Sequence, residues 1–200
     1  MRIDLHTHSL VSDGTDTPTE LVRKAVASGL DVLALTDHDT FDGLAEARLE
    51  AGRAGIALLG GVEISAQRRG ASIHLLGYGC DPHNAPLLEE LARIRAGRTG
   101  RVPAMVARLN ALGMEVTIGD VLARARGASL GRPHVADVLV ERGYAARRDE
   151  VFARWLGEGG PAYVDRYATD LPAAIELVHR AGGVAVLAHS ILAYGLLVAH

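Results

Sequence analysis

Apolar runs with a strand pattern alternate with amphipathic helical patterns through the first part of the chain. This alternation constrains the possible fold more than any other feature of the sequence. The predicted elements are strands at residues 2–6, 31–39, 56–65 and 72–79, and helices at residues 17–30 and 42–55. The run at 31–39 is nearly continuous in apolar residues, as in a strand that is buried on both faces. Alternating strands and helices form βαβ units, in which helices cover a parallel sheet. The sequence therefore predicts an α/β fold with a parallel sheet.

The alternation stops after residue 83, where helical patterns follow one another. Gly97, Gly100 and Pro103 predict a break within the first of these long helices. The strand-and-helix alternation returns at residues 171–190. The predicted organisation is a first α/β part at 1–83, a helical insertion or cap at 84–165, and a continuation of the first part at 166–200.

Composition narrows the class of protein. With 200 residues, 48% of them hydrophobic, the chain can bury a core as one domain with an insertion. It has one cysteine, Cys80, for which we expect a structural role, and it therefore has no internal disulfide framework. No apolar run of about 18 residues indicates a membrane span, and no export signal is visible. We therefore expect a cytoplasmic protein without a membrane partner.

The formal net charge of −3 conceals an asymmetry along the chain. Residues 1–92 carry 14 acidic and 7 basic side chains, whereas residues 93–148 carry 11 arginines and 4 acidic side chains. An acidic part followed by a basic part suits cation binding by the first and anion attraction by the second. The alternative is that these arginines simply lie on solvated helix faces, and the charge pattern by itself favours this alternative. The chain contains no recognised DNA-reading motif, so we expect no sequence-specific DNA binding.

Each predicted strand carries residues of types that commonly bind metals, at its end or within it. They are His6, His8, His38, Glu63, His74 and His189, and Asp13 follows the first strand. Residues 6 and 8 share one strand face because side chains alternate along a strand. The carboxyl ends of strands in a parallel barrel meet at one rim, so these residues should converge. Seven ligands exceed one tetrahedral site and predict two to three divalent ions. Imidazoles and carboxylates without thiolates suit Zn, Mn or Fe.

Several stretches in order resemble the PHP (polymerase and histidinol phosphatase) family. They are DLHTHSLVSDGTDTPTELV, LALTDHDTFDGLAEA, GVEIS, IHLLGYG and AVLAH. The resemblance implies a distorted (β/α)7 barrel with a helical insertion and a metal site of three ions. It assigns His6, His8 and Glu63 to one ion, Asp13 and His38 to a second, and Glu63, His74 and His189 to a third. It also implies that Asp37 orients a ligand imidazole by a hydrogen bond.

The motif GRPHVA places Arg132 and His134 at the start of a predicted helix in the basic part. A guanidinium and a helix N-terminus can hold a phosphate, although an ordinary helix start with a solvated arginine fits the residues equally well. The motif resembles one in PHP enzymes that hydrolyse nucleoside 3′,5′-bisphosphates and trim short RNA from its 5′ end, and this resemblance implies substrate-phosphate binding. Arg98 and Arg101 are weaker candidates for this role.

Other conspicuous side chains have expected roles that are incidental or structural. We expect no function for three histidines and a packing role for two aromatic residues. The histidines are His83, His179 and His200, and the aromatic residues are Tyr78 and Trp155.

The end of the chain departs from the family pattern. After AVLAH the residues read SILAYGLLVAH, and the late Gly-Ser-Asp-x-His motif of the family, whose Asp and His complete the first two metal sites, is absent. The resemblance thus implies a barrel that is incomplete at its C-terminus, with open edges that the apolar residues 191–199 could cover.

The function expected from these features is a metal-dependent phosphatase or phosphodiesterase that acts on small nucleotides such as nucleoside 3′,5′-bisphosphates, or on the 5′ ends of short RNA. Two alternatives stay open. One is a phosphatase of another small phosphomonoester, such as histidinol phosphate. The other is a non-catalytic metal-binding remnant.

Overall fold

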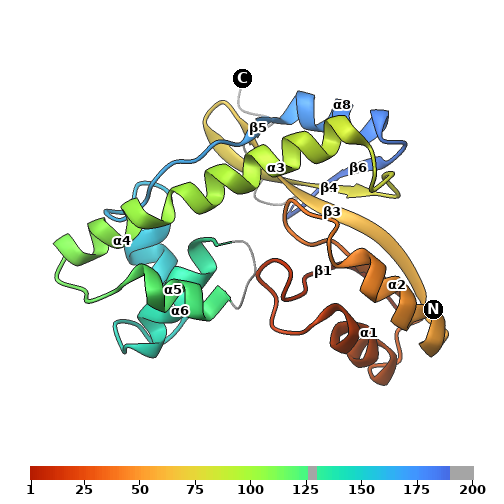
Figure 1. Cartoon of the computed structure of the whole chain (residues 1–200), viewed down its shortest axis with the longest axis horizontal. Coiled ribbons are helices and arrows are strands. Elements are labelled where there is room, and N and C mark those ends of the chain that lie inside the picture. Colours follow the sequence, from red (N-terminus) through yellow and green to blue (C-terminus); the bar gives the residue numbers. More distant parts are fainter. Residues whose placement is uncertain (126–129, 190–200) are drawn as a thin grey trace. The chain divides into compact units, whose positions relative to one another are not determined.

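A computed structural model describes residues 1–125 and 130–189 (Figure 1). The chain divides into two compact units. Unit 1 contains residues 1–94 and the chain from Ala168 onward, and unit 2 contains residues 95–167. The apolar stretch 191–199 and His200 lie outside the described residues. Among the described residues, no helix combines the length and the apolar character that a membrane span requires.

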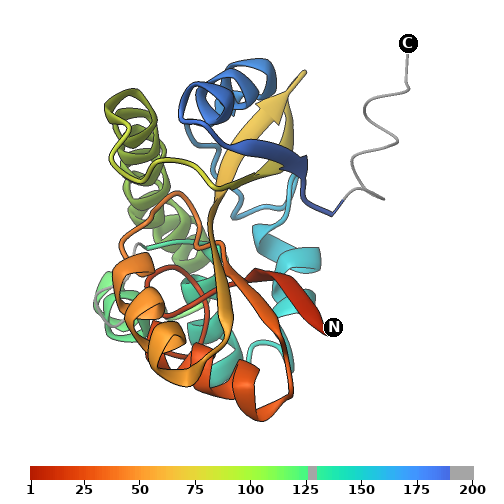
Figure 2. The same ribbon diagram turned by 90° about the vertical axis from the view of Figure 1, so that its right-hand side faces the viewer.

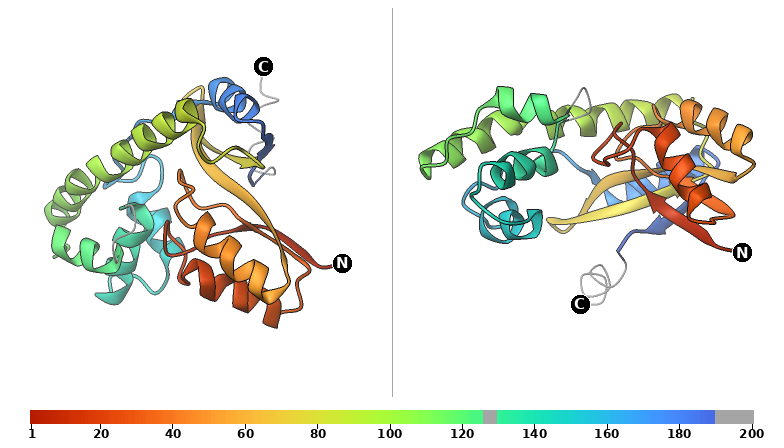
Figure 3. Two further views of the ribbon diagram at one scale, coloured as in Figure 1. Left: turned by 45° about the vertical axis from the view of Figure 1, so that its right-hand side comes forward. Right: turned by 90° about the horizontal axis from the view of Figure 1, so that it is seen from below.

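Unit 1 begins with parallel strands connected by helices. Its first elements are β1 (Ile3–Thr7), α1 (Pro18–Ala27), β2 (Val32–Leu35), α2 (Leu44–Ala54) and β3 (Ala57–Arg68). The strands β1, β2 and β3 pair in parallel, with Val32 opposite both Ile3 and Ala57. The two helices pack against each other beside these strands (Figure 3). The predicted βαβ units are therefore present here.

The ends of these helices follow from local sequence. Thr17 caps α1, since its side chain accepts from the backbone N–H of Glu20 and the Glu20 carboxylate accepts from the Thr17 N–H. Pro18 occupies the first helical position, where a missing N–H costs nothing. Helix α2 ends at Gly55, whose φ of 73° is left-handed and favours glycine. These local signals thus fix the start of α1 and the end of α2.

The second half of the sheet is antiparallel, which corrects the prediction of a parallel sheet throughout. Strand β3 turns at Arg69 and Gly70, both with positive φ, into β4 (Ala71–Tyr78), and the two pair antiparallel over eight positions from Gly61 to Arg68 (Figure 2). A two-residue loop with left-handed φ matches the twist of a hairpin and leaves no room for a crossover helix. Residues 67–71, which lie between the predicted strands 56–65 and 72–79, therefore contain a hairpin turn.

The chain returns to unit 1 through β5 (Thr169–Asp170), α8 (Leu171–Arg180) and β6 (Val184–Leu187). Strand β5 pairs in parallel with the end of β3, and β6 pairs antiparallel with β4. The sheet order is β1-β2-β3-β4-β6. Because β6 runs in the same direction as β1, both strands deliver the residues at their carboxyl ends to one edge of the sheet.

Unit 2 is helical. It contains the end of α3 (Ala85–Gly100), then α4 (Val102–Ala111), α5 (Ile118–Ala125), α6 (Arg132–Glu141), α7 (Arg148–Val151) and the π-helix η1 (Phe152–Leu156). The predicted break lies at Arg101, between α3 and α4. Unit 2 has a hydrophobic core of its own, which includes the fully buried residues Met105, Leu109 and Leu139. Trp155 packs against this core, as predicted. An independent core explains why unit 2 forms a separate compact body.

Candidate metal centre

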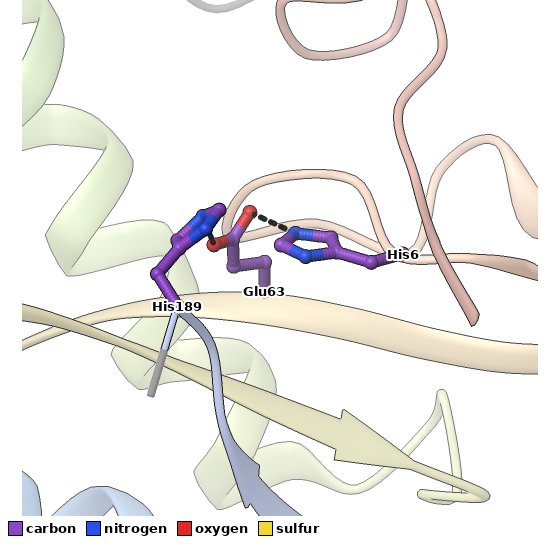
Figure 4. A group of neighbouring side chains, drawn as sticks. All are labelled: His6, Glu63 and His189. Carbon is purple, nitrogen blue, oxygen red and sulfur yellow. Dashed lines mark hydrogen bonds and ion pairs between the residues drawn. The ribbon is translucent and has the colours of Figure 1, made fainter. Parts of the chain in front are cut away.

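Glu63 occupies the centre of a cluster of imidazoles in unit 1. It lies on β3 just after the point where pairing passes from β2 to β4, and its side chain is 1% exposed. Both of its carboxylate oxygens face histidine nitrogens (Figure 4). A buried carboxylate is unfavourable unless it is paired, so the surrounding imidazoles are a condition for its burial.

His6 and His8 approach Glu63 from the end of β1. The Nε2 atom of each lies 3.0 Å from Glu63 Oε2, and the two ring centroids are 5.1 Å apart. The strand is held beside β2 at this point because the Thr7 hydroxyl donates to the carbonyl oxygen of Ala34. The two histidines of the H-x-H pattern therefore share one face, as predicted.

His38 and Asp13 complete this side of the cluster. His38 Nδ1 lies 3.4 Å from Glu63 Oε2, and its Nε2 lies 3.6 Å from Asp13 Oδ2. Asp13 Oδ1 also lies 3.7 Å from His8 Nδ1. The loop that carries Asp13 folds tightly, because a Cβ atom at Gly14 would lie 2.3 Å from the His8 carbonyl oxygen. Glycine at position 14 therefore permits the approach of Asp13.

His74 and His189 approach the other carboxylate oxygen. His74 Nδ1 lies 2.9 Å from Glu63 Oε1, and His189 Nε2 lies 3.8 Å from the same atom. His189 lies two residues after the end of β6 and has a left-handed φ of 52°. The expectation that parallel strands bring the ligands together is wrong for His74, which lies in the middle of antiparallel β4. The hairpin brings it to Glu63 by cross-strand pairing instead.

The cluster is strongly coupled in charge. Burial by itself raises the pKa of Glu63, but hydrogen bonds from His6, His74 and His8 outweigh burial and hold this pKa well below the usual range. Burial lowers the pKa of His8, but the hydrogen bond to Glu63 and the charges of Asp13 and Glu63 raise it overall. The site therefore holds a permanent anion surrounded by groups that bind a cation or a proton.

The geometry fits divalent cations. Ligand atoms of His6, Glu63 and His189 lie within 4.8 Å of one another, and so do those of His8, His38 and Glu63. Imidazole and carboxylate groups at such separations suit Zn²⁺ and other divalent transition metals. All seven candidate ligands predicted from the sequence are gathered here. Glu63 belongs to both groups of three, as a bridging ligand would.

Asp37 lies beside the cluster but contacts different partners from those expected. Its carboxylate accepts from the Ser9 N–H at 2.7 Å, the Ser9 hydroxyl at 2.6 Å and the Ser12 hydroxyl at 2.7 Å. Ser12 Oγ in turn lies 3.5 Å from His8 Nδ1. Asp37 thus acts on the loop of His8 through serines. Sequence reasoning missed Ser9 and Ser12, although both lie in the same short stretch as the H-x-H pattern.

The arginines of unit 2 form a second charged site. Arg98 and Arg101 are buried, and the Nε atom of Arg101 makes no hydrogen bond to any described residue. Burial lowers the pKa of Arg101 to about 9, and the charges of Arg132, Arg166 and Arg98 act in the same direction. These four residues are called the arginine cluster below. The charges of the other three arginines thus disfavour the charged form of Arg101.

Arg132 and His134 lie at the start of α6. The Arg132 guanidinium is half-buried, donates to the Leu156 carbonyl oxygen at 3.2 Å and stacks over the rings of Phe152 and Tyr163. His134 is buried, and its Nδ1 accepts from the Gly131 N–H at 3.2 Å. Arg132 therefore belongs to a packed environment, whereas the described contact of His134 caps its helix.

Comparisons with known proteins agree with this chemistry. The PHP domain family model matches residues 4–93. The chain is 40% identical to a 5′-3′ exoribonuclease of Haemophilus influenzae and 40% identical to a 3′,5′-nucleoside bisphosphate phosphatase of Chromobacterium violaceum, over 94% of this chain and 68% and 66% of those proteins. A Bifidobacterium adolescentis structure assigned as a metal-dependent phosphoesterase superimposes with a TM-score of 0.89 at 37% identity, over 94% of this chain and 66% of that one. The chain thus spans about two thirds of the length of these relatives.

Proposed function

The chain belongs to the PHP domain family, and we propose that it is a metal-dependent phosphoesterase that releases phosphate from small nucleotides such as nucleoside 3′,5′-bisphosphates. The observation that carries the proposal is the position of Glu63, whose two carboxylate oxygens face five imidazoles. A carboxylate shared by two groups of ligands suits a centre with more than one cation, and such centres stabilise both the attacking and the leaving oxygen of phosphoryl transfer.

We assign the metal ligands to the seven residues of the cluster and expect two or three ions, with Mn, Zn or Fe as the candidates. The ligands are His6, His8, Asp13, His38, Glu63, His74 and His189. Divalent ions bound there would supply Lewis acidity toward a phosphoryl group and toward water. Glu63 would neutralise part of the charge that neighbouring cations accumulate. Asp13 would act as a ligand together with its neighbouring imidazoles, because its two oxygens face His8 and His38.

The substrate phosphate is assigned to the arginine cluster, with Arg132 as its principal contact and His134 as the cap that shapes the loop before α6. A guanidinium can bind two oxygens of a phosphate at once, and Arg132 is held for this by stacking on aromatic rings. The repulsion among the buried arginines supports this assignment, because a bound dianion relieves it. The role of these guanidiniums is to bind and orient the substrate.

The substrate class is open to direct comparison. The names of two relatives favour a nucleoside bisphosphate and an RNA that is degraded from its 5′ end as substrates. Histidinol phosphate and a non-catalytic metal-binding remnant are the other possibilities that the sequence leaves. The cytoplasmic location stays a prediction.

The test is phosphate release by protein that has been stripped with a chelator and then loaded with Mn²⁺. The substrates are a nucleoside 3′,5′-bisphosphate, a nucleoside 5′-monophosphate, a short 5′-phosphorylated RNA and histidinol phosphate. We expect release from the bisphosphate that is lost on chelation and restored by Mn²⁺. Metal analysis of the same samples provides the control. Protein that retains two or three ions per chain and releases no phosphate from any substrate would contradict the proposal, and one ion or none would identify a remnant.

A further inference from the structure

Asp39 is a fully buried carboxylate to which the proposed reaction gives no part. It follows His38 directly, and its side chain is 0% exposed. Its Oδ1 accepts from the Ser65 N–H at 2.7 Å, and its Oδ2 accepts from the Ser65 hydroxyl at 2.9 Å. Ser65 is also 0% exposed and lies on β3, two residues after Glu63. A buried carboxylate therefore joins the segment after β2 to the strand of the central ligand.

Backbone contacts on both sides of His38 make the same connection. The Asp39 N–H donates to the Glu63 carbonyl oxygen at 3.0 Å, and the Glu63 N–H donates to the Asp37 carbonyl oxygen at 3.2 Å. His38 and Glu63 thus pair as in a parallel sheet, although β2 ends at Leu35. The Asp39 carboxylate extends this pairing by two residues along β3.

Ser65 also bears on a third ligand. In the β3–β4 hairpin it lies directly opposite His74. Neighbouring strands in a sheet keep a fixed spacing, so a displacement of β3 at Ser65 moves both Glu63 and His74. The bond between Asp39 and Ser65 therefore controls the separation of three proposed ligands from three segments.

The backbone of Asp39 is left-handed, with φ of 57°. This conformation is uncommon for a residue with a side chain, and it persists where the surroundings hold it. It aims the carboxylate at β3, while the preceding imidazole points into the cluster. By contrast, the neighbouring carboxylate, Asp37, holds the loop of His8 and Asp13.

From this geometry we propose that Asp39 is a positioning residue for the metal centre, which acts through Ser65 and holds Glu63 at the distance from His38 that cation binding needs. The inference rests on the proposed function, because it concerns the same centre. The side-chain bonds of Asp39 to Ser65 connect it to β3, and we expect it to act through this strand.

The experiment compares Mn²⁺ binding by the wild type, Asp39→Asn, Ser65→Ala and the double variant. Electron paramagnetic resonance of free Mn²⁺ gives affinity and stoichiometry together, and thermal unfolding of the metal-free protein measures stability separately. Glu50→Gln is the matched control, because Glu50 is another buried carboxylate of unit 1. Glu50 lies on α2, and its Oε1 atom pairs with Arg23 Nε on α1 at 2.7 Å.

We expect Asp39→Asn to weaken Mn²⁺ binding about tenfold or more, as loss of an outer-shell partner of a metal site does. Ser65→Ala should weaken it less, because the bond from the Ser65 N–H remains. The double variant should match Asp39→Asn within about twofold, since both changes remove the bond that the Ser65 hydroxyl donates to the Asp39 carboxylate. Glu50→Gln should lower the unfolding temperature and leave Mn²⁺ affinity unchanged.

A structural role alone predicts the opposite pattern, in which Asp39→Asn unfolds at lower temperature and its folded form binds Mn²⁺ as the wild type does. That result, or full additivity in the double variant, would overturn the inference and leave the proposed function standing. If Asp39→Asn does not fold, unchanged Mn²⁺ affinity of Ser65→Ala overturns the inference by itself. Wild-type protein that binds no Mn²⁺ overturns both proposals.

Discussion

The two units of the molecule bury their charges in opposite ways. In unit 1 the buried carboxylate of Glu63 is surrounded by imidazoles that lower its pKa. In unit 2 a buried guanidinium, Arg101, lies among other arginines, and both burial and these neighbours lower its pKa. The first arrangement compensates a buried negative charge with hydrogen-bond donors of the protein. The second gathers charges of one sign around Arg101. The proposed reaction would use the first for cations and the second for the substrate phosphate.

Glu63→Gln is the change that should damage the molecule most. It removes the anion shared by both groups of ligands and the acceptor for three imidazoles. Breaking a buried charged pair costs about 4 kcal/mol, so we expect Mn²⁺ affinity to fall roughly 1000-fold and phosphate release to disappear. Calorimetric titration with Mn²⁺ measures this.

Glu50→Gln serves as the control, because it neutralises another buried glutamate of unit 1 that pairs with Arg23 and lies on α2. It should leave Mn²⁺ affinity unchanged. Equal losses from both variants would mean that Glu63 matters only for folding, and the comparison between the units would then fail.

The contrast between the units also explains which residues of each site could be predicted from the sequence. The ligands of unit 1 were visible because strand alternation places residues 6 and 8 on one face, and because parallel strands bring their carboxyl ends together. The same reasoning failed for the position of His74, since strands 56–65 and 72–79 form a hairpin and not a βαβ unit. A turn of two residues, Arg69 and Gly70, decides between these connections.

The arginine cluster was less accessible to sequence reasoning. Arginines at helical spacing are usually solvated, and burial depends on which helices pack over them. Arg101 lies at the break between α3 and α4, which glycines and a proline predicted, but nothing local indicates that it is buried beside Arg132. The Asp39–Ser65 bond was hidden for the same reason, because it joins residues 26 positions apart.

Arg132→Ala should have the second largest effect, and on a different quantity. Loss of a charge-assisted contact to phosphate costs about 2 kcal/mol, or roughly 30-fold in kcat/KM, with most of it in KM. Metal stoichiometry should not change, because the ligands belong to unit 1. Arg124→Ala is the control, because it also removes one arginine charge from unit 2. Arg124 lies on α5 and forms an exposed ion pair with Glu141 on α6. A loss of bound metal in Arg132→Ala would show that the two sites are not separate in function.

The two sites should also respond differently to pH. The pKa of His8 is raised, so its bound proton stabilises the metal-free protein below the unfolded value of about 6.5, and this contribution is lost as the pH rises through the raised pKa. Metal binding has the reverse dependence, because the cation displaces that proton. Mn²⁺ affinity should therefore fall about tenfold per pH unit for each displaced proton below the raised pKa.

Measurement of Mn²⁺ affinity and metal-free unfolding at pH 6, 7 and 8 tests this prediction. Binding of sulfate by unit 2 should stay constant over the same range, because sulfate keeps its charge there and the pKa of Arg101 is about 9. A metal affinity that does not change with pH would show that the imidazoles are not the ligands.

Arg101→Met should have the smallest effect, and its sign distinguishes the two units. Replacing a buried, poorly compensated charge by an apolar side chain of similar length is often stabilising, so we expect the free energy of unfolding of unit 2 to rise by about 1 kcal/mol. Trp155, the single tryptophan of the chain, lies in this unit and reports its unfolding by fluorescence. Inorganic phosphate should stabilise the wild type and Arg101→Lys more than Arg101→Met, because Arg101→Met removes one of the four cations of the cluster. If Arg101→Met is instead destabilised as strongly as Glu63→Gln, the guanidinium is already compensated within unit 2, and the repulsion that we assign to the arginine cluster does not exist.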